Sequence, residues 1–235
     1  MSTSNTADER FLVDGIFPST IRDKFEIHSY RSAATILANN YPDQFKKIVE
    51  VLEKFEITTS MIRKPGGSKG LIAKYVDELF EDTDWQETQI TADLHVKLLS
   101  PHGNEILRDY IRKGYLSGHR IDFVNGKVAL DFEWNSKDQT YDRDLYALSA
   151  FHAAGAIDVG ILLTRGNQLD TNFMRSLGKV LTKTGEEGSN DVYKKFGAST
   201  TFMEKLLYRL EAGRNGGCPI LALGITPKCV TLDGE

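Results

Sequence analysis

The chain has 235 residues, enough to bury one sizeable core, and its 40% apolar and 26% charged residues are typical of a globular protein rather than a disordered or fibrous one. Its formal net charge of −4 argues against a protein that coats nucleic acid without specificity, because such proteins carry a large positive excess. A negative total still allows an enzyme whose acidic groups outweigh the cations that line one cleft.

The sequence shows no sign of membrane association or of a disulfide framework. No stretch approaches the roughly 20 consecutive apolar residues of a membrane span, and the polar start lacks the layout of a signal peptide. Cys218 and Cys229 form no CxxC pair, which agrees with a reducing compartment. We therefore expect a cytoplasmic protein without a membrane partner. Residues 1–235 are expected to form one domain, with a mainly helical part over 1–85 and a catalytic core over 86–235.

Two amphipathic helices are predicted in the N-terminal part. Over residues 42–55, and again over 71–80, apolar residues recur at steps of three and four. A loop with two glycines, residues 65–69, leads into the second helix and permits close backbone approach. Such an entry is a place for an anion, so Ser68 and Lys69 are candidates for holding a phosphate. The alternative is an ordinary glycine-rich helix start.

The middle of the chain changes to strand periodicity. Apolar and polar residues alternate over residues 89–98, as in a half-buried strand, and a short helix is expected over 106–111. Two strand-like runs, HRIDFV and KVALDFEW, then flank Asn125-Gly126, the dipeptide that most favours a two-residue type I′ turn. This pattern predicts a hairpin over residues 119–134.

Helices and strands alternate after the hairpin. We expect a helix over residues 142–154 and a strand buried on both faces over 156–164. Thr201 and Glu204 have the spacing of a capping box ahead of a further helix, which a strand over 219–225 follows. The order of elements is that of an α/β fold.

The hairpin carries three acidic side chains. If residues 125–126 form its loop, Asp122 lies opposite Ala129. Side-chain alternation then puts Asp122, Asp131 and Glu133 on one face. Carboxylates so close repel one another unless a cation lies between them, and oxygen ligands with room for water suit Mg²⁺. The chemistry that follows is hydrolysis of a phosphodiester.

A structural reading of the same acids is open at this point. They would form the solvated face of an edge hairpin, with Arg120 opposite Asp131 as a neutralising partner. Spacing alone does not separate this reading from a metal site.

The hairpin and several further segments resemble a known enzyme family. An acid on one strand, then a second acid, one intervening residue and a third polar residue on the next strand, resembles the PD-(D/E)xK nuclease superfamily. The strings RIDF at 120–123, LDFEWNSKD at 130–138 and YDRDL at 141–145 are similar to the BglII family of type II restriction endonucleases, with BamHI-like enzymes as more distant relatives. So are residues 31–56, the 66–67 loop, and the segments GILLTR, FGASTT and GGCP.

This resemblance implies a restriction-endonuclease-like mixed β-sheet flanked by helices, with a helical N-terminal portion. It also implies a homodimer that cuts double-stranded DNA at a short palindrome with Mg²⁺, which Mn²⁺ can replace, beside a separately encoded DNA methyltransferase. By this analogy Asp122, Asp131 and Glu133 are catalytic, and the metal ligands are Asp122, Asp131, the backbone carbonyl of Phe132, and Glu133. Glu133 stands where the superfamily usually has Lys, which leaves the general base open. Glu133 could act on the water or bind a second metal, and Lys137 could supply the missing charge.

Basic and amide side chains near the hairpin and in later loops are candidate DNA contacts. Asn135, Ser136 and Lys137 leave the catalytic strand toward the substrate, although a turn would use the same residue types. Arg143 contacts DNA, supports the metal site with Asp144, or makes a plain helix-surface ion pair with it. The loop candidates are Arg165, Asn167, Lys194, Lys195, Arg214 and Asn215. Each of these alone is more often solvated surface.

The sequence as a whole therefore predicts a type II restriction endonuclease that leaves 5′-phosphate and 3′-hydroxyl ends. Two alternatives share the fold. One is a catalytically silent DNA-binding protein, whose acids would bind no metal. The other is a nuclease of repair or recombination that prefers branched or damaged DNA to a sequence.

Overall fold

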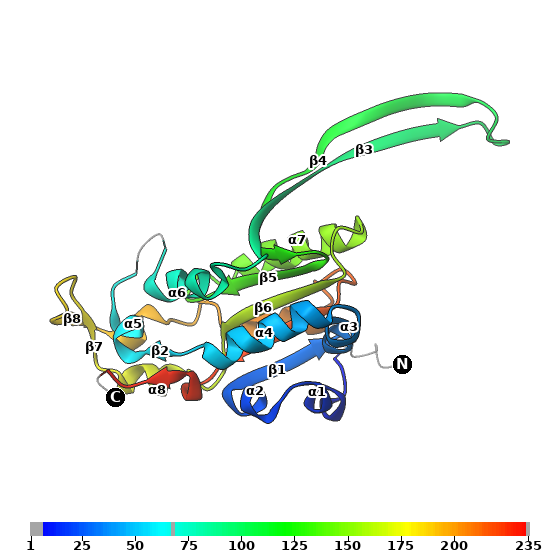
Figure 1. Cartoon of the computed structure of the whole chain (residues 1–235). Coiled ribbons are helices and arrows are strands. Elements are labelled where there is room, and N and C mark those ends of the chain that lie inside the picture. Colours follow the sequence, from blue (N-terminus) through cyan, green and yellow to red (C-terminus); the bar gives the residue numbers. More distant parts are fainter. Residues whose placement is uncertain (1–6, 67–68, 234–235) are drawn as a thin grey trace.

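A mixed six-stranded sheet forms the centre of the molecule in the computed structural model, which describes residues 7–66 and 69–233 (Figure 1). β9, β6 and β5 run parallel, whereas β1 and the β4–β3 pair run antiparallel to their neighbours. The predicted α/β fold with a mixed sheet flanked by helices is confirmed. In spatial order the strands are β1 (Phe25–Tyr30), β9 (Ile220–Ile225), β6 (Val159–Arg165), β5 (Val128–Glu133), β4 (Ile106–Asn125) and β3 (Gln86–Leu99).

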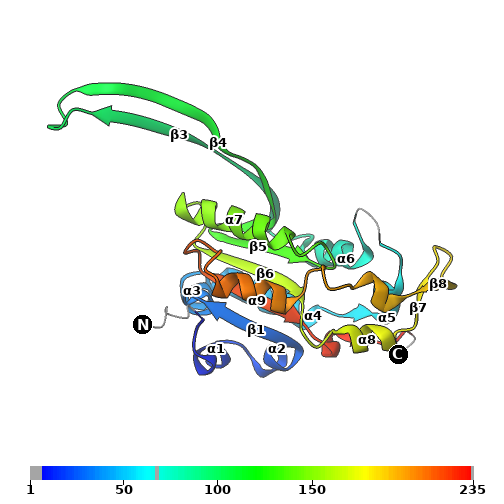
Figure 2. The same ribbon diagram turned by 180° about the vertical axis from the view of Figure 1, so that it is seen from behind.

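Helices cover both faces of this sheet, and each face has its own apolar core. α7 (Thr140–Ala153) and α9 (Met203–Glu211) pack on one face, as Figure 2 shows. Every residue of β5, β6 and β9 is buried between the two layers, so a charged residue on these strands needs a partner. The helices on the other face are α1 (Arg10–Ile16), α2 (Ser19–Lys24), α3 (Ala33–Asn40), α4 (Pro42–Lys54), α5 (Thr59–Arg63) and α6 (Leu71–Phe80).

The remaining described elements are short and lie outside the main sheet. β2 pairs with β10, and β7 pairs with β8. These short elements are β2 (Ile57–Thr58), α8 (Thr171–Ser176), β7 (Lys179–Leu181), β8 (Glu187–Asp191), η1 (Val192–Lys195), η2 (Pro227–Cys229) and β10 (Val230–Thr231).

No helix of the described residues is long and apolar enough to span a membrane.

Long periodic segments form the elements that the sequence predicts. The helices expected over 42–55 and 71–80 are α4 and α6, and those expected over 142–154 and after Thr201 are α7 and α9. Periodicity does not predict β1, because only Phe25 and Ile27 alternate with polar residues before the pattern ends. The mainly helical N-terminal part therefore also supplies an edge strand of the sheet.

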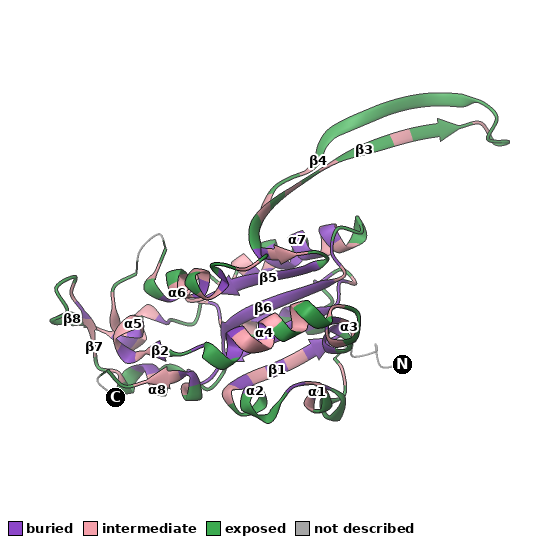
Figure 3. Cartoon of the chain, viewed as in Figure 1, coloured by how far each residue is buried: buried purple, intermediate pink, exposed green. Residues whose placement is uncertain are grey.

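β3 and β4 differ most from expectation. The helix expected over 106–111 is wrong, because these residues belong to β4 and pair with β3. Their apolar residues have helical spacing, but cross-strand pairing decides the structure. The strand expected over 89–98 is present, yet it is mostly exposed rather than half-buried. β4 pairs with β5 only over residues 123–125, so most of the long hairpin formed by β3 and β4 projects from the body (Figure 1 and Figure 3).

The β4–β5 turn lies one residue further along the chain than predicted. Asn125 pairs with Val128, so residues 126–127 form the loop. The loop glycine has a φ of 57° and comes first, as in a type II′ rather than a type I′ turn. The register consequently moves by two positions, and Val124 lies opposite Ala129. A shift of two keeps the alternation of faces but changes which side chains lie side by side.

The predicted capping box at the start of α9 is absent. The N-cap is Phe202, and no side chain caps the helix. The Glu204 backbone N–H donates to Asn167, while the Thr201 hydroxyl accepts a hydrogen bond from the Ser136 N–H at 3.1 Å. Thr201 therefore ties the segment after β5 to the start of α9, a long-range contact that local spacing does not reveal.

Candidate active site

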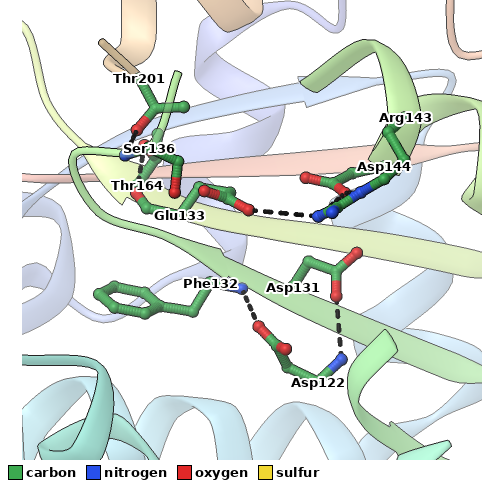
Figure 4. A network of polar contacts seen from close by, with 9 residues as sticks. All are labelled: Asp122, Asp131, Phe132, Glu133, Ser136, Arg143, Asp144, Thr164 and Thr201. Carbon is green, nitrogen blue, oxygen red and sulfur yellow. Dashed lines mark hydrogen bonds and ion pairs between the residues drawn. The ribbon is translucent and has the colours of Figure 1, made fainter. Parts of the chain in front are cut away.

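The ends of β4 and β5 hold Asp122 and Asp131 against each other's backbone. Asp131 Oδ1 accepts a hydrogen bond from the Asp122 N–H at 2.9 Å, and Asp122 Oδ2 accepts one from the Phe132 N–H at 3.0 Å (Figure 4). Side-chain hydrogen bonds thus join β4 to β5 beyond Phe123 and Leu130, where the backbone pairing of the two strands ends. The expectation that Asp122 lies opposite Ala129 is wrong, because Val124 occupies that place and Asp122 lies beside Asp131.

β5 is not the solvated edge strand of the structural reading. It lies between β4 and β6, and Asp131 and Glu133 are 5% and 8% exposed. Arg120, which that reading placed opposite Asp131, pairs with Gln89 of β3, and its guanidinium lies 3.2 Å from Glu87. The acids are therefore buried without the cation that the structural reading required.

Three carboxylates of this site are buried with oxygens left unsatisfied. Asp144 of α7 is 3% exposed and joins Asp131 and Glu133, and one oxygen of each has no hydrogen-bond partner among the described residues. Burial, together with repulsion from neighbouring acids, raises the pKa of Asp131 well above its usual value. Burial also raises the pKa of Glu133 to about 7 and raises that of Asp144. Because an uncompensated buried charge costs on the order of several kcal/mol, this cluster calls for a cation or for protons.

Arg143 and Asp144 do not form a plain surface pair. The exposed Arg143 guanidinium donates to Asp144 Oδ1 at 2.9 Å and lies 3.8 Å from Glu133 Oε1. The Asp144 side chain is buried and faces the same cluster (Figure 4). Helical spacing is the signal that singles out Asp144, because it falls on the buried stripe of Tyr141 and Leu148.

Asp122 connects the buried cluster to an open cleft. Asp122 as a whole is exposed, yet partial burial of its carboxyl group raises its pKa. It lines a cleft of about 460 Å³ together with Glu133 and with Lys69 from the start of α6. Asp77 of α6, which the sequence does not single out, lies in the same wall and pairs with Lys69. A second hollow of about 610 Å³ shares Asp122, Lys69 and Asp77 with the first, so the two form one open surface.

The backbone of Glu133 is fixed by a chain of buried hydrogen bonds. The Tyr141 hydroxyl contacts Thr164 Oγ1 at 2.6 Å, and Thr164 donates to the Glu133 carbonyl at 2.8 Å. Just beyond, Asn135 has a φ of 62° and a buried side-chain oxygen without a partner among the described residues. Satisfied buried networks rigidify their surroundings, so this end of β5 is held in place while the side chains beside it stay unsatisfied.

Some of the predicted DNA contacts lie at this cleft. Lys69, Asn135 and Ser136 line it, and Arg143 borders it through its contact with Glu133. Lys137 is exposed and follows directly. These side chains come from three separate segments of the chain, which meet around the acids.

Other predicted contacts are held by protein groups elsewhere. Arg165, expected in a loop, ends β6; it is 4% exposed and donates to the Thr200 hydroxyl and to backbone carbonyls. Lys195 donates to two carbonyls at the end of α5, and Asn167 joins Glu26 of β1 to the start of α9. The rest are Lys194, paired with Asp191, Arg214, paired with Asp142, and the buried Asn215, while Ser68 lies outside the described residues.

The donor chemistry of the cluster fits a hard divalent cation. Within residues 7–66 and 69–233, no three Asp, Glu, His or Cys side chains are arranged so that they hold one metal ion. Asp122 and Asp131 instead each use an oxygen to accept a backbone N–H. The unpartnered atoms of Asp131, Glu133 and Asp144 are carboxylate oxygens, the donor type that Mg²⁺ prefers. The residues present therefore suit such an ion after side-chain rotation.

Comparison with known proteins gives one match that covers most of the chain. A family model described as restriction endonuclease BglII/BglIII matches residues 25–225. The matched region begins with β1, ends with β9 and includes the acidic cluster. A search of curated proteins gives no match.

Proposed function

Because the chain belongs to the restriction endonuclease BglII/BglIII family, and so to enzymes that cut DNA, we propose that it is a type II enzyme that hydrolyses one phosphodiester in each strand of a short palindromic site. The proposed catalytic residues are Asp122, Asp131 and Glu133. The proposed products carry 5′-phosphate and 3′-hydroxyl ends, and a separately encoded DNA methyltransferase would protect the host's own sites.

The observation that carries this proposal is the set of buried, unpartnered carboxylate oxygens beside the open cleft. A protein that only binds DNA gains nothing from this arrangement, since buried acids cost stability and repel phosphates. In a metal-dependent nuclease the same oxygens become ligands, and the repulsion becomes attraction. The burial of Asp131, Glu133 and Asp144 therefore favours the enzyme over the catalytically silent alternative.

The residues that would hold Mg²⁺, or Mn²⁺ in its place, are Asp122, Asp131, Glu133 and the backbone carbonyl of Phe132. When bound, the ion would supply positive charge to the scissile phosphate and lower the pKa of the attacking water. The raised pKa of Glu133, about 7, suits a side chain that accepts a proton near neutral pH. Asp131 in addition positions the β4 backbone through its bond to the Asp122 N–H.

Cations and amides around the cleft would hold the DNA. Lys69 and Arg143 flank the acids, and residues 135–137 leave β5 toward the cleft, so phosphate contacts would come from both walls. The described part of each chain holds one such cluster, whereas a palindrome presents two equivalent scissile bonds. We therefore propose a two-fold homodimer in which each copy cuts one strand.

The direct test is incubation of the purified protein with plasmid DNA and Mg²⁺, in parallel with excess EDTA and with an Asp131→Ala variant. We expect discrete bands with Mg²⁺ or Mn²⁺ and none in the two controls. Sequencing of the ends reports the cut position and the 5′-phosphate.

Each other outcome contradicts part of the proposal. A smear, or cutting confined to branched or damaged DNA, favours the repair or recombination nuclease. Specific binding without cleavage under any divalent ion favours the catalytically silent protein. Full cleavage in EDTA would overturn the metal assignment.

A further inference from the structure

The hairpin arm, residues 89–120 of β3 and β4, exposes an unusual amount of apolar surface. The backbone of β4 pairs with β5 only over residues 123–125. Ile90 and His119, at the base of the arm, still contact the body, whereas its outer part, from Leu94 to Arg112, pairs only with itself (Figure 3). A two-stranded ribbon is marginally stable alone, and a large exposed apolar patch marks an interaction site. The exposed large apolar side chains of the arm are Leu94, Leu98, Leu99, Ile106, Leu107, Tyr110, Ile111 and Tyr115, eight of the fourteen in the described residues.

The two faces of the arm differ in character. Leu94, Val96 and Leu98 share one face and form an aliphatic row, since alternate residues of a strand point the same way. Their cross-strand partners on this face are Arg112, Tyr110 and Arg108, respectively. We call these six residues the Leu94 face. The two arginines flank the row, and within the described residues neither forms an ion pair with a carboxylate.

The opposite face carries exposed apolar side chains too, Leu99, Ile106 and Ile111, but its charged groups pair with one another. Asp109 pairs there with both His95 and Lys97, so its polar groups neutralise one another across the two strands. Such internal pairing suits a face turned to solvent. The Leu94 face differs in that its two arginines have no carboxylate partner among the described residues, so this face is the better match for an acidic protein surface.

The shape of the arm suits contact with a rounded surface. Register shifts between Ile90 and Ala92 and between Ala92 and Leu94 mark β-bulges, which bend a strand. Gly114 and Gly118, with φ of 61° and 86°, permit the matching irregularities in β4. The arm curves over the side of the body that carries α7 (Figure 1 and Figure 2).

The charge and the side-chain chemistry of the arm indicate which kind of partner fits the Leu94 face. Protein–DNA interfaces are polar and strongly basic, whereas the centre of the Leu94 face is aliphatic, so the face fits protein better than DNA. The arm has five Lys or Arg and three Asp or Glu, a net charge of +2, while the other residues have 24 and 30, a net charge of −6. A basic arm and an acidic body attract one another between copies.

We propose that the Leu94 face docks on a second copy of this chain, so that each arm reaches across the other subunit of a two-fold dimer. Residues 92–99, beyond the part of the arm that packs on its own body, span roughly 26 Å in a ribbon about 10 Å wide, so one face covers roughly 260 Å². Two reciprocal arms, with the equal areas they cover, bury roughly 1,000 Å² in total, the lower end of the range for a specific interface. The arm thus supplies the surface for the dimer that is proposed above on other grounds.

The test compares Leu98→Asp with Ile111→Asp, a matched change to an exposed apolar residue on the opposite face of the same ribbon. Light scattering over a range of concentrations, without DNA, measures the mass against the chain's 26.3 kDa. We expect wild type and Ile111→Asp at twice that mass, and a dimer dissociation constant at least about 100-fold higher for Leu98→Asp, since the change occurs in both arms. Circular dichroism and thermal unfolding check that both variants fold.

A second variant keeps the inference testable if Leu98→Asp does not fold. It removes residues 94–112 and closes the ribbon with Asn-Gly, and it is expected to be monomeric. A monomeric wild type, or a Leu98→Asp dimer as tight as wild type, overturns the inference. So does a Leu98→Asp protein that stays dimeric but loses DNA affinity, because its face would then contact DNA. The mass does not depend on cleavage, so a dimer that cuts no DNA contradicts only the proposed function.

Discussion

The inner and outer parts of β4 depart from ordinary protein surfaces in opposite ways. At its inner end, Asp122 lies against β5, where Asp131 and Glu133 are ionisable groups buried with one oxygen each left without a partner among the described residues. Along its outer part, apolar side chains such as Tyr110 and Ile111 are exposed without a cover. Buried charge and exposed apolar surface each cost free energy, so each marks a place that a ligand completes. One strand thus points to two different partners, a metal with DNA at one end and protein at the other.

The largest effect is expected from Asp131→Ala, which breaks the inner end. Cleavage should fall by roughly a thousandfold or more, because the change removes a proposed metal ligand and the bond to the Asp122 N–H together. Sequence-specific binding should persist, since it comes from phosphate and base contacts elsewhere. Cleavage in Mg²⁺ and gel shifts at a fixed salt concentration measure the two.

The control for this change is Asp191→Ala. Asp191 lies on β8, outside the cleft, and its carboxylate pairs with Lys179 and Lys194. This variant should cut like wild type. If Asp131→Ala is folded by circular dichroism and cuts at a near wild-type rate, the inner end of β4 is not the active site.

Glu133→Gln should lower kcat by roughly a hundredfold, less than Asp131→Ala does, because it keeps an oxygen ligand but removes the proton acceptor. The informative readout is the pH profile. If Glu133 is the general base, the acidic limb of the profile in wild type should disappear in the variant. An unchanged profile with a lower rate would show that Glu133 acts as a ligand and that another group takes the proton.

The sequence predicts which acids form the site better than it predicts the turn and strand register that position them. Alternation along β5 identifies Asp131 and Glu133, and the hairpin links them to Asp122. The turn type is misjudged, since Asn125-Gly126 favours a type I′ turn whereas the loop is residues 126–127. The shift of two positions preserves the faces, which is why the acids still come together.

Features that depend on tertiary packing are harder to predict. Asp144 is buried only because α7 packs its first turn against the end of β5, and Asp77 enters the cleft wall only through α6. Arg165 has the composition of a DNA-reading residue, yet β6 carries it into the interior. In the arm, residues 106–111 have helical spacing, and only pairing with β3 makes them a strand.

The metal-free protein should lose stability as pH rises. The pKa of Glu133 lies near 7 in the folded chain against 4.5 as its reference, so folding favours the protonated form. This contribution is fully present below pH 4.5 and is lost between about pH 4.5 and 7, a change of roughly 3 kcal/mol. The raised pKa values of Asp131 and Asp144 act in the same direction. Urea unfolding in EDTA at several pH values measures the slope.

Two comparisons sharpen this prediction. Mg²⁺ should restore stability at pH 8 more than at pH 5, because ligands must be deprotonated to bind it. Glu133→Gln should flatten the slope in EDTA. A metal-free stability that stays constant or rises from pH 5 to 8 would contradict the view that these acids are buried without compensation.

The smallest effect is expected from Arg143→Ala, which tests whether the exposed rim of the site contacts DNA. Arg143 lies 2.9 Å from Asp144 Oδ1 and reaches toward Glu133, so it is placed to bridge the acids and a phosphate. Losing one phosphate contact should weaken DNA binding roughly tenfold and lower the slope of log affinity against log salt by about 1. Because the charge of Arg143 lowers the pKa of Glu133, the variant should also move the acidic limb of the rate profile to higher pH. The matched control is Arg214→Ala, which removes an exposed arginine paired with Asp142 of the same helix. It should change neither quantity. If Arg143→Ala lowers kcat and shifts the pH profile while DNA affinity and its salt slope are unchanged, Arg143 positions the acids and does not hold a phosphate.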